Sequence, residues 1–217
     1  MSIAPFQQHL QDIEQWLCIH APKIVHESFN LPATADQLDQ LEQTIQKPIP
    51  QAFKELYAWH NGFNAQSANV GSLFYGLDFF DIDFVQKNYL EVKNAQEDTF
   101  FKMENVDSGI NPENHRNPLW IKFGDDSARS SIALDLDPQN PKQYGQIIFI
   151  DYEYDAVLLV ANSIEELVET FLLDLKQGHY LLNEEALEDG NHFLDCIPEI
   201  DLNNWKSKSN IRWKRNF

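Results

Sequence analysis

The sequence predicts an α+β fold, with an antiparallel sheet of about four to six strands and helices packed around it. Apolar residues recur at helical spacing in the first part of the chain, and short apolar runs cluster between residues 119 and 160. Strands that are grouped together, without alternating with helices, are typical of a sheet with segregated helices. With 217 residues, 43% of them hydrophobic, the chain is long enough to bury a core of ordinary size.

The first predicted helix covers residues 5–20. Its apolar residues follow one another at intervals of four, three and four positions, and they are Phe6, Leu10, Ile13 and Leu17. Gln, Asp and Glu stand between them. This pattern places the apolar side chains along one face of an amphipathic helix.

Two more helices are expected before residue 62. Thr34 stands three residues before Gln37, which is the spacing of a capping box, and apolar residues then repeat along one face up to residue 45. Pro50 suits the first turn of the next helix, and Asn61-Gly62 is a typical helix end.

The middle of the chain is expected to contain a strand, a helix and a loop. The short apolar run of residues 73–75 predicts a first strand, and residues 81–96 keep helical spacing. Asn, Pro and Gly are scattered through residues 104–118, which indicates a long surface loop.

The sheet is expected to continue with strands at residues 119–123, 131–137, 147–150 and 156–160. Side chains alternate in polarity along residues 131–137, which predicts a strand that is buried on one face only. Ser163 and Glu166 then form a capping-box pattern for a last helix that ends at Gly178.

The charge balance favours cationic partners. With 34 acidic and 16 basic residues, the formal net charge is −18, which repels phosphate backbones and attracts cationic surfaces. No window holds the run of about 18 apolar residues that a membrane helix needs, and the first residues do not resemble a secretory signal. We therefore expect a cytoplasmic protein that contacts neither nucleic acid nor membrane directly.

The C-terminal tail, residues 206–217, departs from this acidic character. It carries five cationic and no acidic side chains. Two arrangements are open: a solvated, partly disordered end, or a tail that folds back on the acidic body of the chain. Docking is suggested by the aromatic residues Trp205, Trp213 and Phe217, which are interleaved with the charges.

No pattern of catalytic or metal-binding residues stands out. An EF-hand loop that began at Asp135 would need glycine at its sixth position and glutamate at its twelfth, where this chain has Asn140 and Gln146. Cys18 and Cys196 lie far apart, outside any metal-ligand spacing, and are expected to be reduced and mostly buried. We expect no enzymatic activity, no metal and no cofactor.

Three segments rich in carboxylates and aromatic rings are candidates for binding a cationic protein surface. They comprise Phe79, Phe80, Asp81 and Asp83; Asp125 and Asp126; and Asp151, Tyr152, Glu153, Tyr154 and Asp155. Half or more of the chain's aromatic residues in such segments are expected in the core, which needs large side chains. In an interface at these segments, Tyr152→Ala is expected to cost more affinity than Asp125→Ala, because aromatic anchors outweigh rim charges.

A set of short marks along the chain resembles the SUKH superfamily. The marks are Leu31-Pro32, Leu41-Glu42, Ile49-Pro50, Phe53, Leu56-Tyr57, Asn61-Gly62, Trp120 to Asp125, residues 134–138, Gly145-Gln146-Ile147 and residues 161–163. The resemblance covers about residues 31–182, which leaves an N-terminal helical extension, 1–30, and a C-terminal extension, 183–217. Ala128-Arg129 is a departure, because similar proteins often carry a glycine after the acidic turn.

The resemblance implies a partner-binding protein, and two functions are open. SUKH proteins in bacteria include immunity proteins, so the first is neutralisation of a cognate antibacterial toxin domain, such as a basic nuclease, by direct binding and occlusion. The superfamily also includes a fungal regulator of cell-wall assembly. The second function is therefore a non-enzymatic regulatory scaffold of the cell-wall or stress type, which binds an endogenous protein.

Overall fold

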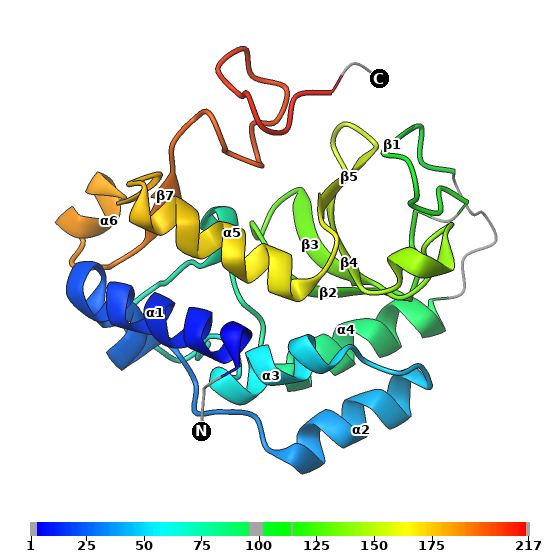
Figure 1. The fold of residues 1–217 in the computed structure, drawn as a ribbon, viewed down its shortest axis with the longest axis horizontal. Coiled ribbons are helices and arrows are strands. Elements are labelled where there is room, and N and C mark those ends of the chain that lie inside the picture. The colour runs from blue at the N-terminus through cyan, green and yellow to red at the C-terminus, as the bar shows by residue number, and fades with distance from the viewer. Residues whose placement is uncertain (1–3, 96–101, 114, 216–217) are drawn as a thin grey trace.

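A computed structural model of the chain describes residues 4–95, 102–113 and 115–215 (Figure 1). Its helices are α1 (Pro5–His20), α2 (Ala35–Ile45), α3 (Gln51–Trp59), α4 (Ile82–Asn94), α5 (Ile164–Lys176) and α6 (Glu184–Glu188). The strands of the main sheet are β1 (Asn105–Val106), β2 (Trp120–Asp125), β3 (Ser130–Asp135), β4 (Gln146–Asp151) and β5 (Ala156–Ala161). A separate hairpin consists of β6 (Tyr180–Leu182) and β7 (Leu194–Cys196).

The main sheet has the strand order β1-β5-β4-β3-β2, and strands β2 to β5 pair in antiparallel fashion. The edge strand β1 instead runs parallel to β5. The sheet is therefore mixed, whereas the sequence predicted an antiparallel one. Helix α5 packs on β4 and β5, α1 packs on α5, and α4 packs on β2 (Figure 1). The predicted α+β class, with helices gathered around one sheet, is confirmed.

Local capping signals place two of the helices. The Oγ1 of Thr34 accepts the N–H of Gln37 at 3.2 Å, and Oε1 of Gln37 accepts the N–H of Thr34 at 3.0 Å, which confirms the capping box of α2. Ser163 accepts the N–H of Glu166 at 3.3 Å. The Glu166 carboxylate accepts the N–H of Asn162 at 2.7 Å and not that of Ser163, so α5 has only half of the predicted box.

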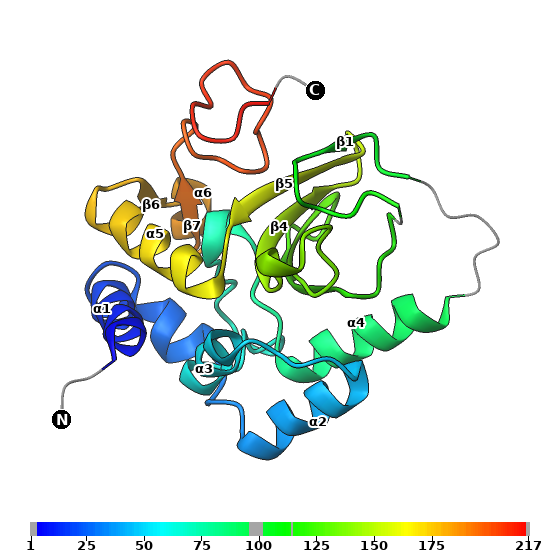
Figure 2. The ribbon, with the colours of Figure 1, turned by 45° about the vertical axis from the view of Figure 1, so that its right-hand side comes forward.

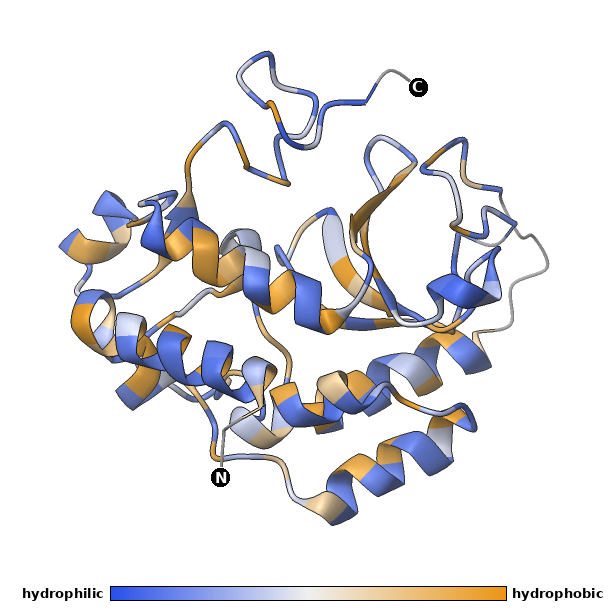
Figure 3. Cartoon of the chain, viewed as in Figure 1, coloured by the Kyte–Doolittle hydropathy of each residue, from blue (hydrophilic) through white to orange (hydrophobic). Residues whose placement is uncertain are grey.

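Strand β3 is buried on both faces, so the prediction of a half-buried strand is wrong. One face belongs to the main core beneath α5. The other joins a second cluster, which consists of Met103, Ile110, Trp120, Ala133, Ile148, Ile150 and Val157. Residues 104–118, expected to be a surface loop, contain β1 and, together with Met103, cover that face; residue 114 lies outside the described part (Figure 2). Figure 3 shows the middle of β4 and of β5 as hydrophobic.

Residues 73–75 do not form the expected strand. They enter a 3-10 turn, Phe74–Gly76, in which Tyr75 has the left-handed φ of 57°. The N–H of Tyr75 donates to the hydroxyl of Tyr180 at 3.0 Å, and the Tyr75 ring meets Trp213 edge to face, with 5.5 Å between centroids. These long-range contacts determine a conformation that the local apolar run does not reveal.

The C-terminal segment folds back on the body, as the docking alternative required. Trp205 and Trp213 are buried, and the Arg212 guanidinium donates two hydrogen bonds to the buried carboxylate of Asp174. Arg215 forms an ion pair with Asp107 at 2.9 Å. Phe217 lies outside the described residues. The main core includes side chains from α1 and from residues 200–213, so both extensions share it with residues 31–182.

Both cysteines are free, which agrees with the expected reduced state. Cys196 is half-buried, whereas Cys18 is exposed, so the expectation of a buried thiol is wrong at position 18. Cys18 follows the buried Leu17, and one step along a helix turns a side chain by about 100°, here toward solvent. In the part of the chain that the structure describes, no helix has the length and apolar character needed to cross a membrane.

The buried Asp135 makes the stability of the fold depend on pH. Burial raises the pKa of Asp135 to about 6, although hydrogen bonds from Gln146 and from the N–H of Asp137 oppose the shift. Because the pKa of Asp135 is higher in the folded chain than in the unfolded chain, the free energy of unfolding falls as pH rises from about 4 to about 6. The loss persists above that range.

We therefore expect Asp135→Asn to be more stable than the parent chain above pH 6, by an amount on the order of 2 kcal/mol. In this variant the Gln146 amide has to turn, so that its Oε1, which has no hydrogen-bond partner among the described residues, accepts the new amide N–H in place of the present bond from Nε2. Urea unfolding at about pH 4.5 and about pH 7.5 measures the difference between the two chains at each pH. A difference that is the same at both pH values would show that Asp135 does not titrate as described.

Candidate functional site

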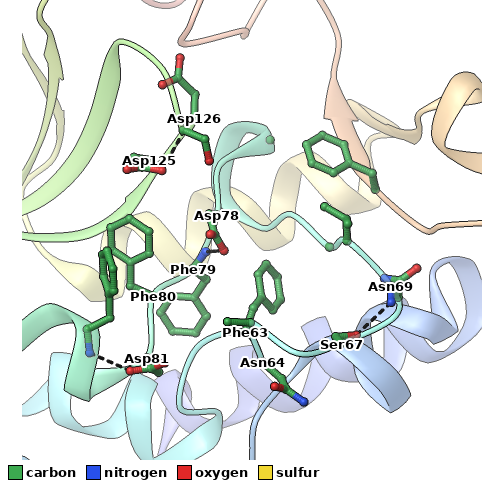
Figure 4. Close-up of a pocket in the computed structure, with 17 residues that line it drawn as sticks. Phe63, Asn64, Ser67, Asn69, Asp78, Phe79, Phe80, Asp81, Asp125 and Asp126 are labelled. Carbon is green, nitrogen blue, oxygen red and sulfur yellow. Dashed lines mark hydrogen bonds between the residues drawn. The ribbon is translucent and has the colours of Figure 1, made fainter.

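A groove of about 450 Å³ brings together two of the three predicted segments (Figure 4). It lies between the loop of residues 63–71, the segment 78–81, the first turn of α4 and the turn 125–127 after β2. This volume is in the range of ligand-binding clefts. This groove is a concave surface where residues from both halves of the sequence meet.

Backbone pairing fixes the relative positions of these segments. The N–H of Asp78 donates to the carbonyl of Asp125 at 2.8 Å, and the N–H of Phe80 donates to the carbonyl of Phe123 at 2.9 Å. Residues 78–80 therefore cover the free edge of β2. A Cβ at Gly124 would lie 2.2 Å from the Asp78 carbonyl oxygen, so only glycine allows this close approach.

Gly62 has a similar role on the other side of the segment. Its φ is +67°, and a Cβ there would lie 2.3 Å from the backbone carbon of Phe80. The preceding Asn61 accepts the N–H of Ile82 at 2.8 Å and so holds the start of α4. The Asn-Gly pair that was expected only to end a helix also positions the groove.

Gly62→Ala is expected to destabilise the chain more than Gly190→Ala does. Gly190 has a comparable φ of +78° with nothing within 4 Å of its Cβ position, so both variants bear the same left-handed strain. Only Gly62→Ala adds a clash with the backbone, which costs about 1–3 kcal/mol in packed interiors. Chemical denaturation of the two variants gives the difference; equal losses would mean that the segment 78–81 can move away freely.

Aromatic residues form the floor and one wall of the groove. Phe80 is half-buried, Phe84 is 43% exposed, and their ring centroids are 4.5 Å apart. Phe79 points into the core with 1% of its surface exposed, so its ring supports the groove from beneath and is not available for direct contact. Figure 4 shows Phe79 and Phe80 on the same segment, pointing in different directions.

Four carboxylates border the groove: Asp78, Asp81, Asp125 and Asp126. Asp81 caps α4 by accepting the N–H of Phe84 at 2.8 Å. Asp126 accepts the N–H groups of residues 128, 129 and 130 at 2.9 to 3.0 Å. These hydrogen bonds shape the turn at Ala128-Arg129, where similar proteins often carry a glycine. Among the described residues, no ion pair involves any of these four carboxylates, although the charge of Lys122 acts on Asp125 and favours its ionised form.

Crowding of these carboxylates changes their proton affinity. Burial raises the pKa of Asp78, and the charges of Asp125 and Asp81 raise it further, although the N–H of Phe79 opposes the shift. Burial and the neighbouring Asp126 likewise raise the pKa of Asp125. At Asp126 burial also acts against ionisation, but the backbone N–H groups outweigh it and hold the pKa below its usual value. A cation in the groove would relieve the repulsion at Asp78 and Asp125.

Asp83 and the turn 151–155 lie outside the groove. Asp83 is exposed on α4, on a shallow surface that it shares with Lys87. Asp151 is wholly buried, where it accepts the indole N–H of Trp205 at 2.9 Å. Its side chain anchors the tail and the turn, and it is not exposed to a partner.

Cations of the same chain lie beside the exposed residues of this turn. The Lys122 ammonium lies 4.9 Å from the centroid of the Tyr152 ring, and the Lys206 ammonium lies 4.2 Å from that of Tyr154. Arg129 forms an ion pair with Glu153. Asp155 is half-buried and accepts the N–H of Glu104 at 3.3 Å. Each exposed side chain of the turn therefore has a cationic neighbour from its own chain, while Tyr152 and Tyr154 remain 41% and 38% exposed.

The sequence prediction missed several residues of the groove. Asp78 and Phe84 directly flank the predicted segment, and an acid-aromatic pattern extended by a few residues would have included them. The loop of residues 63–71 and Phe193 offered no such signal, because tertiary contacts bring them there. The N–H of His192 donates to Asn69 at 2.6 Å, which ties this loop to the chain before β7.

Within the ranges 4–95, 102–113 and 115–215, no group of three His, Cys, Asp or Glu side chains is arranged to hold a metal ion. The groove carboxylates face aromatic rings and backbone N–H groups. This chemistry suits recognition of a cationic surface with apolar neighbours.

Comparisons with known proteins agree with the resemblance found in the sequence. A family model described as the SMI1 / KNR4 family (SUKH-1) matches residues 32–170. The cell wall biosynthesis/cell cycle regulator smi1 of Schizosaccharomyces pombe is 24% identical over 166 residues, which cover 70% of this chain and 33% of the relative. The cell wall assembly regulator SMI1 of Saccharomyces cerevisiae is 22% identical over 234 residues, which cover 92% of this chain and 45% of the relative.

The chain spans between a third and a half of the length of these two relatives. Both are named as regulators of cell-wall processes, and neither is named as an immunity protein. The family match covers well over half of the 217 residues. The protein belongs to the SMI1/KNR4 (SUKH-1) family.

Proposed function

We propose that this chain is a non-enzymatic regulatory scaffold of the cell-wall or stress-regulator type, which acts by binding an endogenous protein. Of the two functions that the sequence left open, this is the one that the named regulators favour. The observation that supports it best is the open groove, where carboxylates without ion-pair partners among the described residues lie beside the exposed ring of Phe84.

The chemistry of the groove lining suits the binding of a cationic partner. General acid-base or nucleophilic chemistry needs a positioned base, a nucleophile and a group that stabilises the transition state. The lining consists of carboxylates, Phe side chains and small polar or apolar residues, with no His, Cys, Lys or Arg among them. Four carboxylates of one sign provide attraction and specificity for a cationic partner.

Neutralisation of a toxin is the second candidate, and the same charge supports it. A net charge of −18 speeds the encounter with any strongly cationic protein, and a nuclease toxin must present such a surface to its substrate. The named relatives do not favour this function, but the chemistry of the groove does not discriminate against it.

Affinity purification of the tagged full chain from its own cells tests the proposal. We expect one endogenous protein to be recovered at about 50 mM NaCl and to be largely lost at about 300 mM, because exposed charges are screened at the higher ionic strength. Stoichiometric recovery of a toxin domain encoded beside the chain's own gene would replace the proposal with the second candidate. Recovery of the same proteins with an unrelated acidic control protein would overturn both.

A further inference from the structure

The chain itself contains an example of what its acidic, aromatic surfaces bind. Two consecutive residues at the start of the C-terminal tail contact the turn 151–155: Trp205 donates a hydrogen bond to Asp151, and Lys206 lies over the ring of Tyr154. Tyr154 and Trp205 also meet edge to face, with 6.1 Å between ring centroids. A chain segment with a tryptophan next to a lysine thus contacts an acid-aromatic surface within the molecule.

The groove presents the same chemistry without an occupant from the described chain. Asp78 and Asp125 line it together with the paired rings of Phe80 and Phe84. The ring of Phe84 and the side chain of Val70 are 43% and 63% exposed, although both are apolar. Apolar surface beside carboxylates that form no ion pair is typical of a site that a partner covers.

Charge determines what kind of segment fits. Asp78 and Asp125 are each repelled by neighbouring carboxylates, which raises the pKa of both. An anionic partner would increase this repulsion. An ammonium or guanidinium would reduce that repulsion, and its aliphatic stem would lie on the Phe80–Phe84 pair. An aromatic or aliphatic neighbour on the same segment would then cover Phe84 and Val70.

We propose that the groove binds a segment of a partner protein that carries Arg or Lys next to an aromatic or large aliphatic residue. This inference rests on the proposed function, because it names the part of the endogenous partner that the scaffold recognises. The cationic side chain lies between Asp78 and Asp125, and the apolar neighbour packs on Phe84. Asp81 and Asp126 contribute long-range attraction while their carboxylates hold the first turn of α4 and the turn after β2.

A random dodecapeptide library displayed on phage, selected against the full chain, tests this inference. Selected peptides are then measured against Asp78→Asn/Asp125→Asn by fluorescence polarisation. Asparagine keeps the side-chain oxygen that accepts the N–H of residue 79 or 127, so both turns are retained. Asp36→Asn/Asp39→Asn is the matched control, because it removes the same charge from exposed positions of α2, outside the groove.

The enriched peptides are expected to carry Arg or Lys next to an apolar residue and to bind the groove variant about tenfold more weakly than the control variant. Enrichment of peptides without a cation, equal binding to both variants, or no enrichment at all would each overturn the inference. The proposed function is judged separately by the purification experiment. If an endogenous partner binds the groove variant as well as it binds the parent chain, the proposed function stands and the assignment of the groove as its binding site is refuted. If the groove selects cationic peptides but the purified partner is a toxin domain, the binding site stands and the proposed function is refuted.

Discussion

Replacing Phe84 by alanine is expected to weaken the binding of the selected cationic peptides about tenfold or more, since aromatic side chains at the centre of an interface are common hot spots. Phe84 is 43% exposed and contacts Phe80 within the groove. Because much of its surface is already in water, the free energy of unfolding should fall by less than about 1 kcal/mol. Fluorescence polarisation gives the affinity, and urea unfolding gives the stability.

Tyr152→Ala is the matched control for this variant. Tyr152 is 41% exposed, which is nearly the same fraction as for Phe84, but it lies outside the groove with Lys122 over its ring. The sequence pointed to Tyr152 as an anchor, whereas the structure favours Phe84. A larger loss of affinity in Tyr152→Ala than in Phe84→Ala would return the interface to the turn 151–155 and contradict the groove.

Replacing Arg212 by alanine is expected to lower the free energy of unfolding by about 3 kcal/mol. Asp174, on α5, is 2% exposed and accepts hydrogen bonds from two nitrogens of the Arg212 guanidinium, at 2.5 and 2.7 Å. Without Arg212, the buried carboxylate keeps one side-chain hydrogen-bond partner among the described residues, His179, at 2.9 Å. Removing one member of a buried ion pair lowers the free energy of unfolding by more than the intact pair contributes to it, because the remaining charge stays buried without its partner.

Two further variants isolate the cause of this loss. Lys208→Ala removes the same charge from an exposed position of the tail and should change stability by less than about 0.5 kcal/mol. Arg212→Lys keeps the charge but cannot reproduce the paired geometry, so an intermediate loss is expected. If Arg212→Ala and Lys208→Ala unfold at the same urea concentration, the tail does not contribute to the stability of the body.

Local signals predicted the helices well because the interactions that define them are short in sequence. The capping box of Thr34 and Gln37 connects residues three positions apart, and α2 begins at the residue after Thr34. The regular spacing of Leu10, Ile13 and Leu17 placed α1, and all three residues are buried. These patterns are complete within one or two helical turns, so a sequence alone contains them.

Features that depend on distant contacts were not accessible in the same way. Tyr75 adopts a left-handed conformation because its N–H is bound by Tyr180, far along the chain, and no local pattern indicates this. The docking of the tail was only one of two alternatives until Arg212 was seen to meet Asp174. In each case the decisive partner lies in another element, where sequence spacing carries no information.

The candidate site shows the same division. Sequence reasoning found Asp125 and Asp81 as parts of two acidic segments, and the structure brings both to one groove. It could not distinguish Phe79, which faces the core, from Phe80, because neighbouring positions in an irregular segment have no fixed periodicity. It also could not foresee that residues from the chain's own tail would contact the turn 151–155.

Site-specific photocrosslinking in the chain's own cells shows whether an endogenous protein occupies the groove. A photoreactive benzoylphenylalanine replaces Phe84 in the groove, or Leu173 on α5 as a control that is 51% exposed and outside it. We expect one endogenous protein to crosslink at position 84 but not at position 173. The crosslinked segment of that protein should contain Arg or Lys. Equal crosslinking at both positions, or adducts at position 84 only with a toxin domain, would contradict it.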